Sequence, residues 1–370
     1  MKNRFLWIIY AVIVLVIFIF AIWVVYYITT HSSRLDFRTF FGAGTAAAGG
    51  VPIYSLYGIY MHPFWYFPWV AWQFIPFTPF TFSQAWYAYI LLCCGLLWGI
   101  VVFYSKRFSI SENLLDKVFI YSMSLLLCMM LFNFGQTNIL VLAWITLVVV
   151  LLEQKKHFLA GIVMPLSLIK PHLLIIFVIA FLLKGGKKGF IGAALSSLAM
   201  FGLEFLLDPT WIRDFIELFA YGSKRDDDLY WDHTTLPNLL GFDENYVGTA
   251  NLPIILLLLL IGTLVVWKFR TLPPSKLIAL GLAGSLLGAP RAFGYDLVLL
   301  LPAMMLLSER FSWKTFLLWI MAIIIPFAYN FSTGSYILTL LVFGLSVWKL
   351  RQQGTKQYDI LTPTSNAYTP

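Results

Sequence analysis

The sequence predicts an all-α polytopic membrane protein, and two observations support this fold class. Of the 370 residues, 60% are hydrophobic and 11% are charged, and the mean hydropathy is +0.83. A soluble domain has no core large enough to cover so much apolar surface. The apolar residues are also grouped into runs that are long enough to form membrane-spanning helices.

The first apolar run, at residues 5–28, predicts a retained membrane helix. It is longer than the apolar core of a signal peptide, and the sequence YYITTHSS after it has no small-residue cleavage pattern. Further apolar runs lie at residues 81–104, 117–132, 139–152, 158–169, 171–183, 189–206, 252–267, 277–289, 295–307, 314–329 and 335–348. Together these runs predict about twelve crossings.

The charges predict which ends of the helices face the cytoplasm. If the N-terminus is cytoplasmic and each run crosses once, most Lys and Arg residues fall inside and most Asp and Glu residues fall outside. The net charge of +8 is then explained by topology and by attraction to anionic lipid, so we expect no nucleic-acid partner. We expect a multi-pass protein of the cytoplasmic (inner) membrane, with both termini in the cytoplasm.

One transmembrane domain is expected over residues 1–350. It has a first outer loop at 29–80 and a second long outer loop at 207–250. Segment 63–80 is aromatic and proline-rich, and a crossing there would reverse the charge bias of every later loop, so we expect it to lie at the outer interface. The polar residues 351–370 predict a disordered cytoplasmic tail.

The cysteines and histidines predict neither a disulfide framework nor a metal site. Cys93, Cys94 and Cys128 all lie inside apolar runs. His62 and His233 are single histidines without the spacing of metal ligands. We therefore expect no metal and no other cofactor.

The unusual polar residues gather on the predicted outer side. Ionisable groups at membrane depth are costly, so they usually have a partner or a function. Simple structural roles are possible for some: Asp36 as a helix cap paired with Arg38, Gln136 and Asn138 as hydrogen bonds between helices, and Lys170 as an interfacial lysine. The group comprises Arg34, Asp36, Arg38, Gln136, Asn138, Lys170, His172, Asp226–Asp228, His233, Arg291, Tyr295 and Asp296.

Taken in order, five motifs resemble glycosyltransferase family 87 over about residues 5–307. Phosphatidylinositol-mannoside mannosyltransferases are more distant, because they carry paired histidines where this chain has Tyr295-Asp296. The motifs are Asp-Phe followed by aromatic and small residues at 36–44, the aromatic and Pro-rich segment 63–80, Gly-Gln-x-Asn at 135–138, Ala-Gly and then Lys-Pro at 160–171, and Tyr-Asp-Leu at 295–297.

The resemblance implies a GT-C-like helical bundle whose outer first loop carries juxtamembrane helices. It also implies transfer of one sugar, mannose or a similar hexose or pentose, from a polyprenyl-phosphate sugar to a glycolipid or glycan acceptor. The family's catalytic carboxylate occupies the position of Asp36, on the outer (periplasmic) face.

The residue types suggest a role for each polar residue on the predicted outer side. Asp36 is the expected general base for the acceptor hydroxyl, in a reaction with inversion. Cations are needed at the donor phosphate, and we expect Lys170 and Arg291 there first, then Arg34 or Arg38. The residues expected to bind the sugar or the acceptor are Gln136, Asn138, Tyr295, Asp296, His172 and His62.

Two other functions fit a polytopic chain with these polar residues. A transporter or lipid flippase would use them to line a path across the membrane. A lipid-linked polysaccharide polymerase or ligase would use arginines and a histidine in a late outer loop, and Arg213, Arg225 and His233 lie in or beside 207–250.

Overall fold

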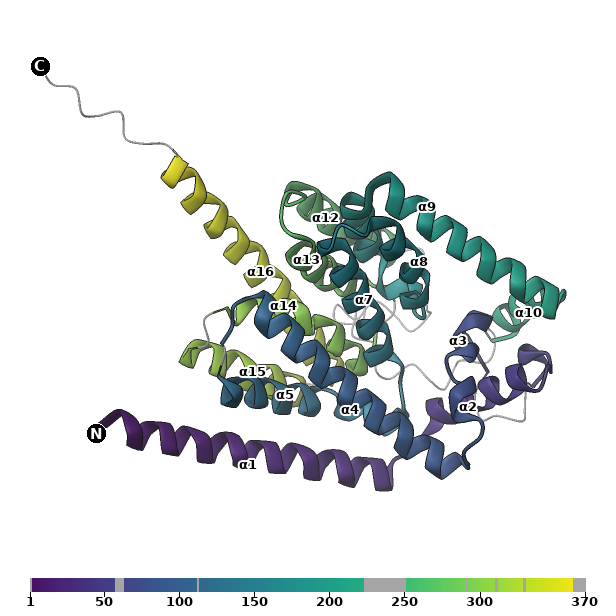
Figure 1. Cartoon of the computed structure of the whole chain (residues 1–370), viewed down its shortest axis with the longest axis horizontal. Helices are drawn as coiled ribbons and strands as arrows, with labels where there is room; N and C mark the ends of the chain where they lie inside the picture. The colour runs from purple at the N-terminus through teal and green to yellow at the C-terminus, as the bar shows by residue number, and fades with distance from the viewer. Residues whose placement is uncertain are drawn as a thin grey trace, which may run out of the picture.

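The computed structural model describes residues 2–56, 63–111, 113–222, 251–290, 292–309, 312–328 and 331–361. These residues form helices joined by turns, with no strand among them, which confirms the all-α prediction (Figure 1). The helix α1 (Lys2–His31) begins at the left of the view, whereas α2 (Leu35–Ala48), α3 (Pro68–Trp72) and α10 (Trp211–Gly222) gather at the right. The short helices that follow α1 therefore lie at the opposite end of the view from the start of α1.

The N-terminal helix α1 (Lys2–His31) lies along one side of the bundle. Its inner face packs on α5 and α6, with Val14 and Ala21 fully buried. Its outer face is apolar as well, since Val16 and Phe20 are more than half exposed. In lipid an apolar helix with all its backbone groups paired internally is stable, so this helix suits a membrane and not water.

Three helices of the described residues are long and apolar enough to cross a membrane. They are Trp7–His31, Phe82–Arg107 and Ile175–Leu207. Shorter apolar helices surround them, so the chain is a membrane protein, while the number of twelve crossings and the GT-C-like arrangement stay predictions. These shorter helices are Asn138–Glu153, His157–Ser167, Leu252–Lys268, Pro274–Leu287, Gly294–Leu307 and Trp313–Pro326.

The segment between α1 and α4 folds into short helices instead of crossing. A Cβ at Gly44 would lie only 2.8 Å from the Cβ of Phe74, so the small residue lets α2 pack closely against the start of η2. Trp69 and Phe74, inside the proline-rich segment 63–80, are buried against this unit. The helices are α2 (Leu35–Ala48), η1 (Ile53–Leu56), α3 (Pro68–Trp72) and η2 (Ile75–Phe77).

The bundle itself begins at α4, whose start is fixed by a capping box between Thr81 and Gln84. The helices up to residue 222 are α4 (Phe82–Arg107), α5 (Leu114–Leu127), α6 (Met129–Phe134), α7 (Asn138–Glu153), α8 (His157–Ser167), η3 (Pro171–Leu173), α9 (Ile175–Leu207) and α10 (Trp211–Gly222). The later ones are α12 (Asn251–Lys268), α13 (Pro274–Leu287), η6 (Gly294–Leu300), α14 (Leu301–Leu307), α15 (Trp313–Ala328) and α16 (Phe331–Leu361).

Helix α9 is two helices in sequence, because Gly186 has a φ of 57° and a ψ of −157°. The break agrees with the separate apolar runs predicted at 171–183 and 189–206. After the break, Gly189 and Gly192 pack directly on the backbone of α8, where a Cβ at Gly192 would overlap the Phe158 carbonyl. Small residues thus bring these two helices into close contact.

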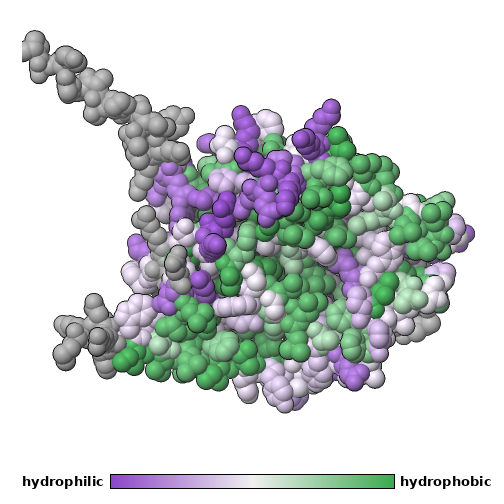
Figure 2. All heavy atoms as spheres, viewed as in Figure 1, coloured by the Kyte–Doolittle hydropathy of each residue, from purple (hydrophilic) through white to green (hydrophobic). Residues whose placement is uncertain are grey.

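Basic side chains gather at the end of the bundle away from α2. Arg107 and Glu153, the last residues of α4 and α7, form an ion pair of 2.6 Å. The Lys184 Nζ donates to the Arg270 carbonyl at 2.6 Å, beside the turn after α12. Hydrophilic side chains gather over α12 at the top of the view, above a mainly hydrophobic middle (Figure 2). This end is the one that the charge bias predicts to be cytoplasmic.

The last helix extends further than the sequence predicted. α16 continues to Leu361, so residues 351–361 are helical where we expected the start of a disordered tail. The helix continues because Arg351 to Leu361 contains no proline, and the Thr-Pro pairs come only after it. Residues 362–370 lie outside the described part of the chain.

Candidate active site

A tight turn between α6 and α7 carries the Gly-Gln-x-Asn motif. Gly135 ends α6 with a φ of 78°, the left-handed conformation that favours glycine. A Cβ there would also meet the Phe37 side chain and, at 2.8 Å, the Trp86 ring. Both the backbone and the packing therefore require glycine at this position, and the next three residues are placed between α2 and η6.

Gln136 connects the turn to Asp36. Its Nε2 donates to Asp36 Oδ2 at 2.6 Å, and its backbone carbonyl accepts from the Tyr89 hydroxyl of α4 at 2.6 Å. Gln136 is buried, whereas Asp36 is half-buried.

Asp36 lies in the first turn of α2, where the positive end of the helix dipole favours a carboxylate.

Asn138 connects the same turn to Asp296. Its Nδ2 donates to Asp296 Oδ1 at 2.5 Å and to the Tyr295 carbonyl at 3.1 Å. The Asp296 Oδ2 accepts the backbone N–H of Phe293 at 2.7 Å. Each oxygen of this carboxylate, which is 1% exposed, therefore has a donor, as a buried charge requires.

Lys170 completes the arrangement with a buried ion pair. Its Nζ is 3.0 Å from Asp296 Oδ1 and 4.4 Å from the centre of the Tyr295 ring. Lys170 is 5% exposed, so its charge is compensated by Asp296 and by the ring face. The lysine that we expected at the donor phosphate is thus paired with the aspartate that we expected at the sugar.

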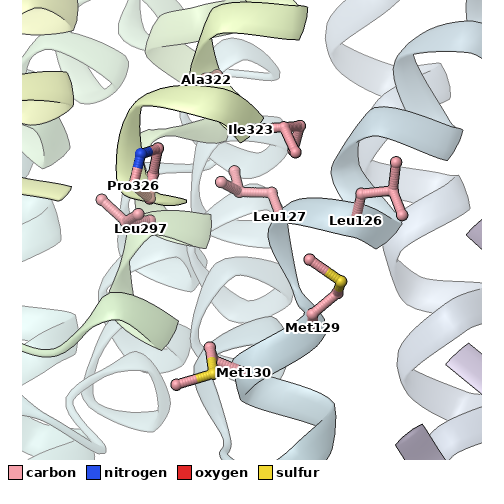
Figure 3. A pocket seen from close by; sticks show the side chains of 8 residues that line it. All are labelled: Leu126, Leu127, Met129, Met130, Leu297, Ala322, Ile323 and Pro326. Carbon is pink, nitrogen blue, oxygen red and sulfur yellow. The ribbon is translucent and has the colours of Figure 1, made fainter. Parts of the chain in front are cut away.

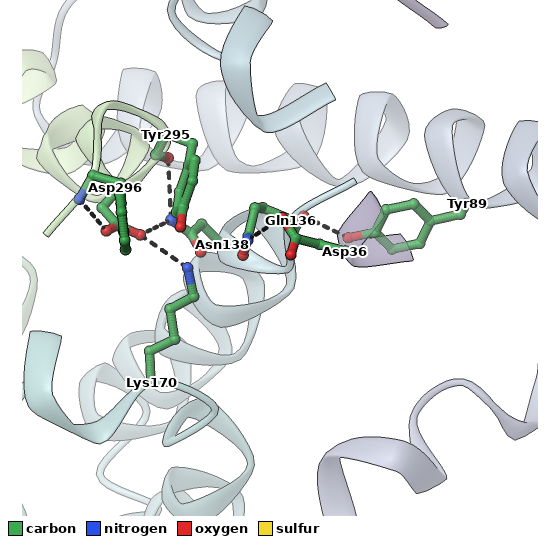
Figure 4. A network of polar contacts seen from close by, with 8 residues as sticks. Asp36, Tyr89, Gln136, Asn138, Lys170, Tyr295 and Asp296 are labelled. Carbon is green, nitrogen blue, oxygen red and sulfur yellow. Dashed lines mark hydrogen bonds and ion pairs between the residues drawn. The ribbon is translucent and has the colours of Figure 1, made fainter. Parts of the chain in front are cut away.

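These contacts form one polar network of Asp36, Tyr89, Gln136, Asn138, Lys170, Tyr295 and Asp296 (Figure 4). The turn lies in the middle, with one carboxylate on each side of it. Its members come from α2, α4, α7, η6 and the turns before α7 and η3, and one bonded pair, Asn138 and Asp296, is 158 positions apart in the sequence. The fold thus brings together six of the residues that the sequence indicated for the outer side: Asp36, Gln136, Asn138, Lys170, Tyr295 and Asp296.

Three polar atoms of the turn are buried and have no hydrogen-bond partner among the residues that the structure describes. They are Gln136 Oε1, Thr137 Oγ1 and Asn138 Oδ1. Ionised carboxylates only accept hydrogen bonds, so the amide nitrogens of Gln136 and Asn138 must face Asp36 and Asp296. The amide oxygens then point elsewhere, and the turn offers acceptors to groups that carry O–H or N–H.

Two arginines flank Asp36 on α2. Arg34 is the N-cap residue, with a φ of 53°, and its guanidinium lies 5.7 Å from the centre of the Trp86 ring. Asp36 is therefore not the helix cap that the simple structural interpretation proposed. Arg38 is exposed, and its guanidinium lies 5.6 Å from the centre of the Phe82 ring. Positive charge thus surrounds the approach to Asp36.

Of the other polar residues that the sequence indicated for the site, one lies in the described part of the chain. His172 is half-buried in η3, two residues after Lys170. His62, Arg291 and His233 lie outside the described residues, as does Asp226–Asp228. Sequence reasoning missed Tyr89, because a tyrosine inside an apolar helix has no pattern that separates it from the packed aromatics around it.

A small apolar pocket lies beside the network, between α15 and the break that separates α5 from α6 (Figure 3). One of its residues, Leu297, follows Asp296 directly. No polar side chain lines it, so it offers no group for acid–base chemistry. The lining residues are Leu126, Leu127, Met129, Met130, Leu297, Ala322, Ile323 and Pro326.

The comparison with protein families identifies what kind of protein carries this site. The model of glycosyltransferase family 87 matches residues 64–293, which is more than half of the chain. The match at 64–293 includes Gln136, Asn138 and Lys170, whereas Asp296 lies shortly after its end and Asp36 well before its start. No curated protein and no solved structure matches the chain. The family match confirms the predicted resemblance and favours sugar transfer over transport: this chain belongs to glycosyltransferase family 87.

Proposed function

We propose that this glycosyltransferase moves one sugar, mannose or a similar hexose or pentose, from a polyprenyl-phosphate sugar to a glycolipid or glycan acceptor. The reaction takes place at the outer face of the cytoplasmic membrane. The observation that carries the proposal is the half-buried Asp36 carboxylate, which Gln136 holds at 2.6 Å beside a turn with three unpartnered polar atoms.

Asp36 acts as the general base in a single displacement. The acceptor oxygen attacks the anomeric carbon, the bond from that carbon to the phosphate oxygen breaks, and the hydroxyl proton passes to Asp36. Attack from the side opposite the leaving group inverts the anomeric centre. The hydrogen bond from Gln136 Nε2 keeps the Asp36 carboxylate in one orientation for this transfer.

The turn binds hydroxyl groups of the transferred sugar. Sugar hydroxyls donate hydrogen bonds, and Gln136 Oε1 and Asn138 Oδ1 are acceptors without a donor in the described part of the chain. The half-buried Tyr295 ring, which stacks on Phe293 with 5.0 Å between the ring centres, provides an apolar face beside them. His172 and His62 remain candidates for contacts with the acceptor.

Arg34 and Arg38 are the best candidates for the leaving phosphate, together with Arg291. Both arginines on α2 lie within two residues of Asp36, and a guanidinium can bind phosphate with two parallel hydrogen bonds. Lys170 contributes less direct charge, because its ion pair with Asp296 is neutral overall. Its role is to hold Asp296 and Tyr295 in place.

The substitution Asp36→Asn tests the proposed base. In membranes supplied with radiolabelled polyprenyl-phosphate sugar, this variant should transfer at least about 100-fold less sugar, because the amide cannot accept the proton. The amide keeps the size of the carboxylate, so expression and retention of the donor lipid should be unchanged. The matched control is Asp214→Asn on α10, which should transfer sugar like the parent.

Transfer by Asp36→Asn within a few-fold of the parent rate would reject Asp36 as the base. If the variant also stopped retaining the donor lipid, Asp36 would be a binding group instead. Transfer that requires no polyprenyl-phosphate sugar would reject the donor class.

A further inference from the structure

A second group of incompletely bonded polar side chains lies where α9 meets α10. Glu204, in the last turn of α9, is 4% exposed, and its Oε2 has no hydrogen-bond partner. In the described part of the chain no cation forms an ion pair with it. The Trp72 side chain hydrogen-bonds to the Glu204 carboxylate. Leaving the other oxygen of a buried carboxylate without a donor is still costly, so this side chain needs an explanation.

Two donors in the same place are also unpaired. The Nε1 atoms of Trp69 and Trp211 are buried and have no acceptor. Both indole rings pack on Phe201, with ring centres 5.0 and 5.5 Å away. Phe201 precedes Glu204 by three residues and shares its face of α9. One aromatic cluster therefore contains two unpaired donors and one unpaired acceptor.

Aromatic rings from the outer segment complete this cluster. Phe67 stacks on Trp69 at 4.5 Å, and Phe215 lies 5.5 Å from both Phe67 and Tyr54. Burial and the charges of Glu204 and Asp208 raise the pKa of the Tyr54 phenol, so this ring also lies near Glu204. Phe67 and Phe215 are half-buried and form the accessible side of the cluster.

We propose that Glu204, Trp69 and Trp211 form a second site, which binds a neutral carbohydrate. A cation would satisfy Glu204 but leave both indole N–H groups unpaired. An anion would satisfy the N–H groups but be repelled by Glu204, and an alkyl chain would satisfy neither. Hydroxyl groups both accept and donate, so a sugar satisfies all three, and its apolar face suits the surrounding rings.

This second site shares no residue with the network around Asp36. α2 has 14 residues and a length of about 21 Å. Asp36 lies at its start, while α3, which carries Trp69, packs along it and against α9. If the proposed function holds, the second site binds part of an acceptor glycan whose other part reaches Asp36.

The test measures binding of simple glycosides without any donor lipid. The full-length protein in lipid nanodiscs is titrated with methyl α-D-mannopyranoside, methyl β-D-glucopyranoside and methyl α-D-arabinofuranoside, and saturation-transfer NMR gives the affinity. The parent should bind at least one of them. Trp69→Phe, which keeps an aromatic ring but removes the N–H and part of the ring area, should weaken that binding about five-fold, as should Glu204→Gln.

Two controls separate this site from the first. Trp98→Phe makes the same change on α4, next to Tyr121, and should leave the affinity unchanged. Asn138→Ala removes the central contact to Asp296, and binding at the second site should survive it.

Three results would overturn the proposal. The first is no binding of any of the three glycosides, which would mean that water alone completes the cluster. The second is equal affinity in Trp69→Phe and the parent. The third is loss of binding in Asn138→Ala only. Because no donor is present, these results are independent of the transfer assay with Asp36→Asn.

Discussion

At the scale of single residues, the site is organised by amides that bridge carboxylates. Gln136 and Asn138 each give their N–H groups to an aspartate, and the aspartates lie on opposite sides of one turn. The sequence indicated these residues because polar side chains at membrane depth are costly. It could not indicate the partners, since Asp36 and Gln136 are 100 positions apart and no local pattern connects them.

The Lys170–Asp296 pair allows a prediction about stability. Lys170→Met leaves the buried Asp296 charge unpaired, so the free energy of unfolding should fall by about 3–5 kcal/mol, measured by titration with a denaturing detergent. The double variant Lys170→Met/Asp296→Asn should lose less than the sum of the two single variants, because neither charge is then left alone.

The control for this prediction is Lys349→Met. Lys349 pairs with Glu309 at 3.3 Å, and both side chains are at least 20% exposed. Partly hydrated pairs contribute little, so this variant should lose about 1 kcal/mol or less. An equal loss in Lys170→Met and Lys349→Met would contradict the buried ion pair.

At the scale of helices, hydropathy predicted most boundaries closely. A helix was expected at residues 139–152, and the observed helix spans Asn138–Glu153. The lysines between two apolar runs indicated the break near Gly186. By contrast, the run 117–132 is divided at Cys128 into α5 and α6. A break between apolar residues leaves the hydropathy unchanged, so the sequence could not show it. The break matters for the site because α6 then ends at Gly135, and the packing around Gly135 places the Gly-Gln-x-Asn turn.

The contact between α8 and α9 can be tested by one substitution on α9. Gly192→Val should disrupt this contact, because even a Cβ would overlap the Phe158 carbonyl. The matched control is Gly202→Val on the same helix, where a Cβ meets no atom within 4 Å. Size-exclusion chromatography in detergent should show aggregated Gly192→Val and monodisperse Gly202→Val. Equal behaviour of the two variants would mean that α8 and α9 do not pack in this way.

At the scale of the whole molecule, the two ends of the bundle differ in chemistry. One end has exposed lysines and arginines that pair with helix termini, such as Lys184 and Arg107. The other has α2 and the buried polar network. A lipid-linked donor whose sugar faces outward must meet the second end, so the proposed function requires that end to lie outside the cell. The charge bias of the loops predicts the same orientation.

Labelling with a membrane-impermeant thiol reagent tests this orientation most directly. Cysteine is placed in turn at two exposed positions, Arg38 beside Asp36 and Lys187 at the other end, with Cys93, Cys94 and Cys128 replaced by alanine. In intact spheroplasts Arg38→Cys should react, whereas Lys187→Cys should react only after the membrane is permeabilised. Reaction of Lys187→Cys alone in intact spheroplasts would place Asp36 inside the cell and contradict the proposed transfer at the outer face.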